Sequence, residues 1–389
     1  THLEDSIILD GIQGGKDAIK LLEEMGQKLA GTKGMGISLT TKWDGAPAII
    51  CGYDPADGRF FVGTKSVFSK EPKLCKTEQD IQRQYSGALA QKLSAALRYL
   101  PSSVKSGILQ GDLMFTDDKK REKIDGKMFT TFRPNTITYA ADPQTPLGRE
   151  IDQAKIGIVF HTKYEGQTLA QMNASFMIRD QDFQKSINVW AEKATFTDIS
   201  GVATFSPQEL AQYEKVVNMA RGSLKQAAPM LEKIQSGQKS LKFDTEFLKF
   251  FNNYVKAGRN VPSVAQATED YMRHMTAEFD KATGKLKTDK AINAKNRVWA
   301  EQTLFILKNR QQFSMVIAAY MNLQMAKTML VNKLKRVSSL RLFVDKGGGD
   351  YVATTPEGFV AISGDKATKL IDRLEFSKLN FTIPKNWDK

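Results

Sequence analysis

Histidine and cysteine are scarce in this sequence, whose 389 residues include three His and two Cys. The two cysteines, Cys51 and Cys75, cannot make a disulfide framework, and they lack the C-x-x-C spacing of a zinc site. Three scattered histidines leave little room for His-based catalysis or for a multi-His metal centre. We therefore expect any chemistry to rest on Lys, Arg, Asp and Glu.

A long apolar run and a secretion signal are also lacking. The most apolar stretch, 313–331, is interrupted by Asn322, Gln324 and Lys327, so it falls short of the roughly 20 apolar residues that span a bilayer. The first residues show no basic segment followed by an apolar one. The sequence predicts a buried helix at 313–331, no membrane partner and a cytoplasmic location, in the host cytoplasm if the protein is phage-encoded.

Charge is plentiful and unbalanced, with 56 Lys and Arg against 43 Asp and Glu and a net charge of +13. Such an excess suggests a polyanionic partner, although charge alone does not identify one. Hydrophobic residues make up 41% of the chain and charged residues 25%. These shares are typical of a folded globular protein and exclude wholesale disorder.

Short β-rich runs separated by turn residues fill 36–180 and return after 341. They are typical of a mixed, mostly antiparallel sheet, with one helix predicted over 77–100. A Gly-rich stretch at 11–17 departs from the phosphate-loop pattern, because the Ser or Thr expected after Lys16 is an Asp. We interpret that stretch as a turn before a helix.

Helical spacing is found over 13–30 and again over 206–337. Ser206 and Glu209 have the spacing of a capping box, and one long helix is predicted over 291–337. The fold class expected is α+β.

The order of these tracts predicts a split domain and an insertion. We expect a strand-rich domain formed by 1–195 and 340–389. An all-helical insertion domain is expected over 196–339.

The most informative segment is TTKWDGAPAII, which carries Lys42, Asp44 and Gly45 between two β-rich runs. Taken alone, a K-x-D-G tetrapeptide is most simply a surface lysine in a turn. Other residues suited to chemistry follow it at the ends of strands or within them. They are Lys65 in VGTKS, Asp112 in ILQGDLMF, Phe160 in IGIVFHTKY, Glu357 in TPEGFVAI and Lys369 in ATKLIDR. A carboxylate inside an apolar strand is costly to bury unless it binds something.

This ordered set resembles the covalent nucleotidyltransferase superfamily, which comprises ATP-dependent DNA ligases, RNA ligases and mRNA capping enzymes. K-x-D-G matches the family's motif I at Lys42, GTKS is similar to motif Ia with Lys65 in place of the commoner Arg, and QGDL is similar to motif III with Asp112 in place of Glu. The resemblance implies a ligase adenylation fold with mixed, mostly antiparallel sheets.

The later motifs follow in the family's order. IVFH looks like motif IIIa with Phe160 as its aromatic residue, and PEGFVA matches motif IV at Glu357. TKLID resembles motif V at Lys369, but the usual second lysine is Ile371 here, and Lys366 can serve instead.

Roles for these residues come with the resemblance. Lys42 would attack the α-phosphate of ATP to form lysyl-AMP, and Lys369 would stabilise the charge that develops there. Mg²⁺ or Mn²⁺ is the implied metal, with Glu357 and Asp112 as its ligands, although the family also assigns the position of Asp112 to the ribose hydroxyls. The remaining residues implied to bind the nucleotide are Asp44, Gly45, Lys65, Lys366 and Phe160.

One of these positions keeps an alternative. Phe160 either stacks on the purine or belongs to the core. His161 follows it and is most simply a polar residue at a strand end.

Two departures from the family pattern narrow the choice among the members of the superfamily. Position 40 is Thr, where DNA ligases usually carry an acidic residue that helps to read adenine, so ATP rather than GTP is inferred from the family alone. The stretch after Arg373 is too short for the OB domain that DNA ligases and capping enzymes append. We therefore expect no OB domain, and RNA ligases are favoured.

The sequence thus predicts an ATP-dependent polynucleotide ligase that acts on RNA or DNA, with RNA favoured. A basic stretch at 281–297 fits a nucleic-acid partner, although it can also be a solvated face. The alternatives are a nucleotidyltransferase with another acceptor, and a non-catalytic nucleic-acid-binding or virion protein with a ligase-like fold. Protein partners are not indicated.

Overall fold

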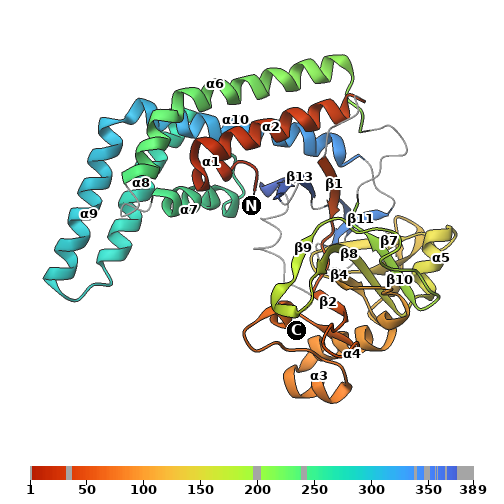
Figure 1. Ribbon diagram of the computed structural model, residues 1–389. Coiled ribbons are helices and arrows are strands. Elements are labelled where there is room, and N and C mark those ends of the chain that lie inside the picture. Colours follow the sequence, from red (N-terminus) through yellow and green to blue (C-terminus); the bar gives the residue numbers. More distant parts are fainter. Residues whose placement is uncertain are drawn as a thin grey trace. The chain divides into compact units, whose positions relative to one another are not determined.

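The chain forms two compact units in the computed structural model, one helical and one rich in strands (Figure 1). The helical unit comprises the described parts of Thr1–Ile37, Gly201–Leu334 and Ala367–Phe381, and the strand-rich unit those of Ser38–Ser200 and Lys335–Lys366. The structure describes residues 2–31, 37–195, 203–237, 243–336, 340–345, 351–354, 356, 358–363 and 366–374.

The helical unit is built around long helices that bury apolar faces against one another. Its helices are α1 (Ser6–Leu9), α2 (Gly11–Leu29), α6 (Pro207–Gly237), α7 (Phe243–Lys256), α8 (Val264–Thr283), α9 (Asp289–Lys308) and α10 (Arg310–Leu334). Most of strand β14 (Lys366–Ile371) also belongs to it. Tyr213 of α6 is fully buried and donates a hydrogen bond to the backbone oxygen of Leu22 on α2 at 2.6 Å, which fixes these two helices side by side.

The strand-rich unit holds two larger sheets. One has the strand order β10-β8-β4-β2-β3, with β9 paired to β8, and the other has the order β12-β11-β7-β6-β5. Every pairing in these sheets is antiparallel except that of β10 with β8. Strands β1 and β13 are neighbours in a further sheet.

Many of these strands coincide with the β-rich runs of the sequence, but β10 lies outside 36–180. The first sheet contains β2 (Ala48–Tyr53), β3 (Phe60–Gly63), β4 (Ile108–Phe115), β8 (Ile156–Glu165), β9 (Asn173–Ser175) and β10 (Val189–Lys193). The second contains β5 (Lys120–Ile124), β6 (Lys127–Phe132), β7 (Ile137–Ala141), β11 (Arg341–Asp345) and β12 (Tyr351–Ala353). The remaining elements are β1 (Ile37–Lys42), β13 (Gly358–Ser363), α3 (Glu78–Gln84), α4 (Gly87–Tyr99), α5 (Pro146–Gln153) and the short 3₁₀ helices η1 (Lys65–Phe68), η2 (Leu100–Ser102) and η3 (Leu169–Gln171).

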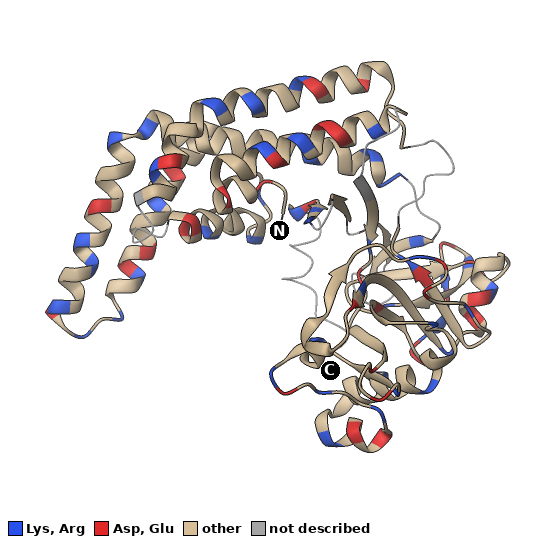
Figure 2. Ribbon diagram, viewed as in Figure 1, with Lys and Arg blue, Asp and Glu red and all other residues tan. Residues whose placement is uncertain are grey.

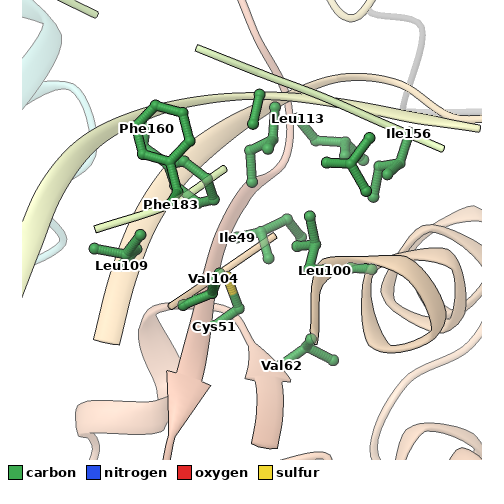
Figure 3. Packing of buried hydrophobic residues seen from close by; sticks show 14 of the residues in the cluster. Ile49, Cys51, Val62, Leu100, Val104, Leu109, Leu113, Ile156, Phe160 and Phe183 are labelled. Atoms are coloured by element: carbon green, nitrogen blue, oxygen red, sulfur yellow. The ribbon is translucent and has the colours of Figure 1, made fainter. Parts of the chain in front are cut away.

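The main core of this unit lies between the first sheet and α4 (Figure 3). Leu109 and Leu113 of β4 point into it and are fully buried. Because side chains alternate along a strand, Gln110 and Asp112 lie on the opposite face of the same sheet. This alternation lets a carboxylate occupy an otherwise apolar strand.

The predicted α+β class with mostly antiparallel sheets is confirmed. The sequence predicted a strand-rich domain over 1–195 and 340–389 and a helical insertion over 196–339. The structure differs from this division near both chain ends. The N-terminal helices and the described part of Ala367–Phe381 belong to the helical unit, because α2 packs along α6. No helix among the described residues is long and apolar enough to cross a membrane.

Three predicted helices have different bounds in the structure. The helix expected over 77–100 is divided into α3 and α4 at Tyr85 and Ser86. The long helix expected over 291–337 is divided at Asn309, whose side chain donates to the backbone oxygen of Phe305 at 2.8 Å. The Gly-rich stretch at 11–17 is not a turn, because α2 begins at Gly11.

Candidate functional site

Lys42 is the last residue of β1, and its strand is held on both edges. The backbone nitrogen of Thr41 donates to the oxygen of Ala194 at 2.7 Å, and the Thr40 hydroxyl donates to the oxygen of Val360 on β13 at 3.3 Å. Lys42 itself is half-buried. The lysine therefore stands at the end of a fixed strand, where the chain turns into the K-x-D-G loop.

Asp44 anchors that loop to the turn between β6 and β7. Its carboxylate is 3% exposed and accepts four hydrogen bonds. The donors are the Asn135 side-chain amide at 2.7 Å, the Thr136 nitrogen at 2.7 Å, the Thr136 hydroxyl at 2.6 Å and the Ile137 nitrogen at 2.7 Å. Four donors match the acceptor capacity of an ionised carboxylate. Asp44 therefore holds the loop that positions Lys42, and its carboxylate is occupied by protein donors.

Trp43 holds the same loop through aromatic contacts. Its ring stacks on Tyr139 with centroids 5.4 Å apart and meets Trp190 edge-on at 6.1 Å. The Tyr139 hydroxyl also accepts a hydrogen bond from the Asp44 nitrogen at 2.8 Å. The two residues after Lys42 are thus both held by β7, and the backbone leaving the lysine has little freedom.

Gly45 brings the loop against β4 at Asp112. A Cβ atom at position 45 would lie 2.5 Å from the Asp112 Cβ and 3.1 Å from the Leu113 oxygen, so only glycine fits without a shift of the backbone. The Ala46 nitrogen donates to the Leu113 oxygen at 3.0 Å, and the Leu113 nitrogen donates to the Pro47 oxygen at 3.0 Å. The structure therefore brings together the two segments that the sequence identified as K-x-D-G and QGDL.

Lys65 lies at the same end of the sheet. β3 runs antiparallel to β2 with Gly63 opposite Ile50, so the residues after Gly63 continue towards the start of β2, where the K-x-D-G loop enters. Lys65 opens η1 and is exposed. Asp112 is opposite Ala48, the first residue of β2. The strand register thus places the K-x-D-G loop, Lys65 and Asp112 near the start of β2.

His161 is a site residue that sequence reasoning did not identify. Its Nε2 lies 3.7 Å from Oδ1 of Asp112, and the two side chains are 29% and 25% exposed. Its Nδ1 lies 2.8 Å from the Thr162 hydroxyl. An irregularity in the β4–β8 register next to Gly111 accommodates the extra residue. A local bulge of this kind leaves no clear mark in the sequence.

Phe160 belongs to the core, which was one of the two roles that the sequence left open for it. Its side chain is completely buried among the residues of the main core and packs against Phe183 with ring centroids 5.3 Å apart (Figure 3). In this structure both faces of the ring meet protein, so no face is offered to a purine.

The remaining predicted residues are not brought into this arrangement. Glu357 lies outside the described residues. Lys366 is exposed at the start of β14. Lys369 is exposed on β14 within the helical unit, where its backbone bridges to His2.

A divalent metal can be tested against the side chains present. Within the described ranges, no group of three or more His, Cys, Asp or Glu side chains is arranged to hold a metal ion. Mg²⁺, however, is commonly held by one or two carboxylates together with substrate phosphates and water. The partly exposed carboxylate of Asp112 fits one such position, and Glu357 remains a predicted second ligand.

Comparison with known proteins identifies a family but no activity. A family model described as a family of unknown function, DUF6267, matches residues 1–385, so the chain belongs to this family. No curated protein and no solved structure matches the chain.

Proposed function

We propose that this member of the DUF6267 family is an ATP-dependent polynucleotide ligase that forms a covalent lysyl-AMP at Lys42. The observation that carries the proposal is the fixed loop after Lys42, which is anchored by Asp44 and pressed through Gly45 onto β4 beside Asp112. A lysine nucleophile works only when its amine is held in line with the reacting phosphorus, and such positioning can supply much of the rate enhancement.

In the first step the unprotonated Lys42 amine attacks the α-phosphorus of ATP. A nitrogen–phosphorus bond forms, the bond to the bridging oxygen breaks, and pyrophosphate leaves. The lysine nitrogen loses a proton to solvent. A divalent metal, when bound, would offset the negative charge of the phosphates and of the leaving pyrophosphate.

The later steps pass AMP to a nucleic acid. An oxygen of a 5′-phosphate attacks the lysyl-AMP phosphorus and frees the lysine. A 3′-hydroxyl then attacks the activated 5′-phosphate, and AMP leaves as the strands join. RNA is the favoured substrate, and DNA is the alternative.

The residues around Lys42 suit complementary roles in this proposal. Lys65 is an exposed cation at the same end of the sheet and would meet the phosphates. Asp112 and His161 lie side by side and are both partly exposed, so they can hold the ribose hydroxyls or a metal. Roles for Glu357, Lys366 and Lys369 remain predictions from the motif resemblance.

A labelling experiment tests the first step. The protein is incubated with α-labelled ATP and Mg²⁺ or Mn²⁺ and then denatured. We expect label that withstands denaturant and alkali and that mild acid releases, as a phosphoramidate requires. Lys42→Ala should carry none, whereas Lys105→Ala, which removes an exposed lysine of the same unit, should be labelled like the wild type.

A joining assay then separates the possible acceptors. Labelled protein is offered single-stranded and nicked substrates of RNA and of DNA. Joined product supports the ligase, with the preferred strand given by the relative yields. Label without joining on any of the four substrates would support a nucleotidyltransferase with another acceptor, and absence of label from the wild type would overturn the proposal.

A further inference from the structure

The turn between α8 and α9 carries a dense group of positive charges. Residues 281–297 contain six Lys or Arg and a single acidic residue, Asp289. All six basic side chains are exposed. Figure 2 shows Lys and Arg positions in blue on α8, α9 and the turn that joins them. We define the six side chains as the basic tip: Lys281, Lys285, Lys287, Lys290, Lys295 and Arg297.

Most of these cations have no acidic partner. Arg297 pairs with Glu301 at 3.0 Å. The other five have no carboxylate within 4.0 Å in the part of the chain that the structure describes. Their charge is therefore compensated by solvent and salt, and it would favour the approach of a polyanion.

The helices that carry the basic tip are held firmly. Phe279 of α8 stacks on Trp299 of α9 with centroids 4.9 Å apart, which joins the two helices close to the turn. Thr288 caps α9 by accepting a hydrogen bond from the Ala291 nitrogen. At the base of α8, the buried Tyr271 packs against Phe313 of α10 at 4.9 Å. Figure 1 shows α8 and α9 as a hairpin that extends from the rest of the helical unit.

We infer that the basic tip binds the phosphate backbone of a nucleic acid. Lys290 and Arg297 are seven residues apart, so they share one face of α9 at a spacing of about 10 Å along its axis. Charges at the turn and along one helix face form an extended row. A polynucleotide offers a matching row, with one phosphate about every 3.4 Å along each strand.

The side chains of the tip also indicate what kind of contact it makes. Within 281–297, which the structure describes throughout, no large hydrophobic side chain is strongly exposed. Insertion into a lipid surface needs such side chains, and stacking on bases needs free aromatic rings. Backbone contact that does not depend on base sequence is therefore the mode that fits.

This inference goes beyond the proposed function, because it concerns the helical unit and does not depend on chemistry at Lys42. The test measures binding of a labelled oligonucleotide of mixed sequence by fluorescence anisotropy over a range of salt concentrations, without ATP. The tip variant combines Lys285→Gln, Lys287→Gln and Lys290→Gln. The control variant combines Lys16→Gln, Lys215→Gln and Lys225→Gln, which remove the same charge from exposed positions on α2 and α6.

We expect the affinity of the wild type to fall linearly with the logarithm of salt concentration. The tip variant should bind on the order of 10²-fold more weakly at 0.1 M salt, and its salt slope should be smaller by about 2 to 3. The control variant should lose less than about threefold, since its charges act only through the overall field.

Three outcomes would overturn the inference: no salt-dependent binding by the wild type, equal losses in the tip and control variants, or tighter binding of anionic vesicles or polyglutamate than of nucleic acid. Failure here is distinguishable from failure of the ligase proposal. The tip variant keeps Lys42 and its loop, so it should still accept label from ATP.

Discussion

At the scale of single residues, Asp44 decides whether Lys42 is presented in one fixed geometry. Its carboxylate gathers four hydrogen bonds from Asn135, Thr136 and Ile137. A buried carboxylate bonded in this way stabilises the turn between β6 and β7, and through it the loop that follows the lysine. The same acidic residue thus supports both the fold and the proposed chemistry.

Replacing Asp44 should therefore cost stability as well as labelling. Asp44→Ala leaves buried donors without an acceptor, and we expect the free energy of unfolding to fall by about 3 kcal/mol. Urea denaturation measures this loss, and labelling with ATP should fall at least tenfold at a temperature where the variant is folded. Asp117→Ala, at an exposed position, should change stability by less than about 0.5 kcal/mol. Equal effects of the two substitutions would remove the anchoring role of Asp44.

Sequence reasoning reached some of the site residues but not others. Lys42, Asp44 and Gly45 were identifiable because a short motif at a strand end carries them together. His161 was missed because its position beside Asp112 depends on an irregularity in the β4–β8 register. Phe160 could not be assigned, because an aromatic residue in an apolar strand has the same local pattern whether it faces a ligand or the core.

At the scale of elements, α10 carries a buried ion pair within the helical unit. The Lys327 amine donates to both carboxylate oxygens of Glu4 at 2.6 and 2.7 Å, and the two side chains are 1% and 0% exposed. Near them, Arg373 donates to Asp5 at 3.0 Å and also bonds Asn252. The contacts of Lys327 hold the turn before α1 against α10. They also explain how a lysine is tolerated inside the apolar stretch 313–331.

Removing one charge of the Glu4–Lys327 pair should lower the free energy of unfolding. Glu4→Gln leaves the Lys327 charge buried with too little compensation, and we expect a loss of about 3 to 5 kcal/mol in the free energy of unfolding. Glu4→Leu combined with Lys327→Leu should recover at least half of that loss, because it removes both buried charges. Glu301→Gln breaks the exposed pair with Arg297 and should cost less than about 1 kcal/mol. A small loss for Glu4→Gln, similar to that for Glu301→Gln, would contradict this account.

The segment before α1 also makes the stability of the helical unit depend on pH. Burial, together with the nearby charge of Arg373, lowers the pKa of His2 from 6.5 to about 3. Between those values the unfolded chain binds a proton that the folded chain does not, so stability falls as the pH is lowered from about 6.5 towards 3. The lowered pKa of Glu4, caused by Lys327 against the effect of burial, acts in the same direction at more acidic pH, whereas burial raises the pKa of Asp5 and opposes it.

Thermal unfolding at pH 7.5 and pH 5 measures the contribution of His2. The wild type should lose stability between the two values, and His2→Gln should lose clearly less, because its side chain does not titrate. The difference between the two chains isolates His2 from the carboxylates. An identical pH dependence in both would show that His2 titrates alike in the folded and unfolded states.

Local patterns predicted many elements but not all of their bounds. The capping box at Ser206 and Glu209 is confirmed, with hydrogen bonds of 2.8 and 3.2 Å in the two directions. The break between α9 and α10 was not predicted, since Asn309 is polar and does not exclude a continuous helix. It ends α9 through the hydrogen bond to Phe305, which composition does not reveal.

At the scale of the whole molecule, the strands were predicted better than the division into units. The β-rich runs correspond to β1–β4, β7 and β8 because their alternation is local. The place of the N-terminal helices depends on long-range packing, in which Gly15 of α2 leaves room for Leu224 and Gly26 leaves room for Tyr213. Such glycine contacts determine which helices meet, and a single sequence does not show them.

Two groups of cations contribute to the net charge of +13, and each has a separate proposed role. One group of cations lies near the K-x-D-G loop at Lys42 and Lys65, where ATP phosphates would bind. Another forms the basic tip of the helical unit, where a polynucleotide backbone would bind. The two groups make separate predictions, since ATP labelling depends on the first and salt-sensitive nucleic-acid binding on the second.

The most direct test of the central claim is to locate the nucleotide on the protein. The wild type is incubated with ATP and Mg²⁺ or Mn²⁺, digested at alkaline pH to preserve the nitrogen–phosphorus bond, and analysed by peptide mass spectrometry. The account predicts the mass of one AMP on the side chain of Lys42 and on no other residue. An unmodified Lys42 peptide, or AMP on another residue that persists in Lys42→Ala, would contradict it.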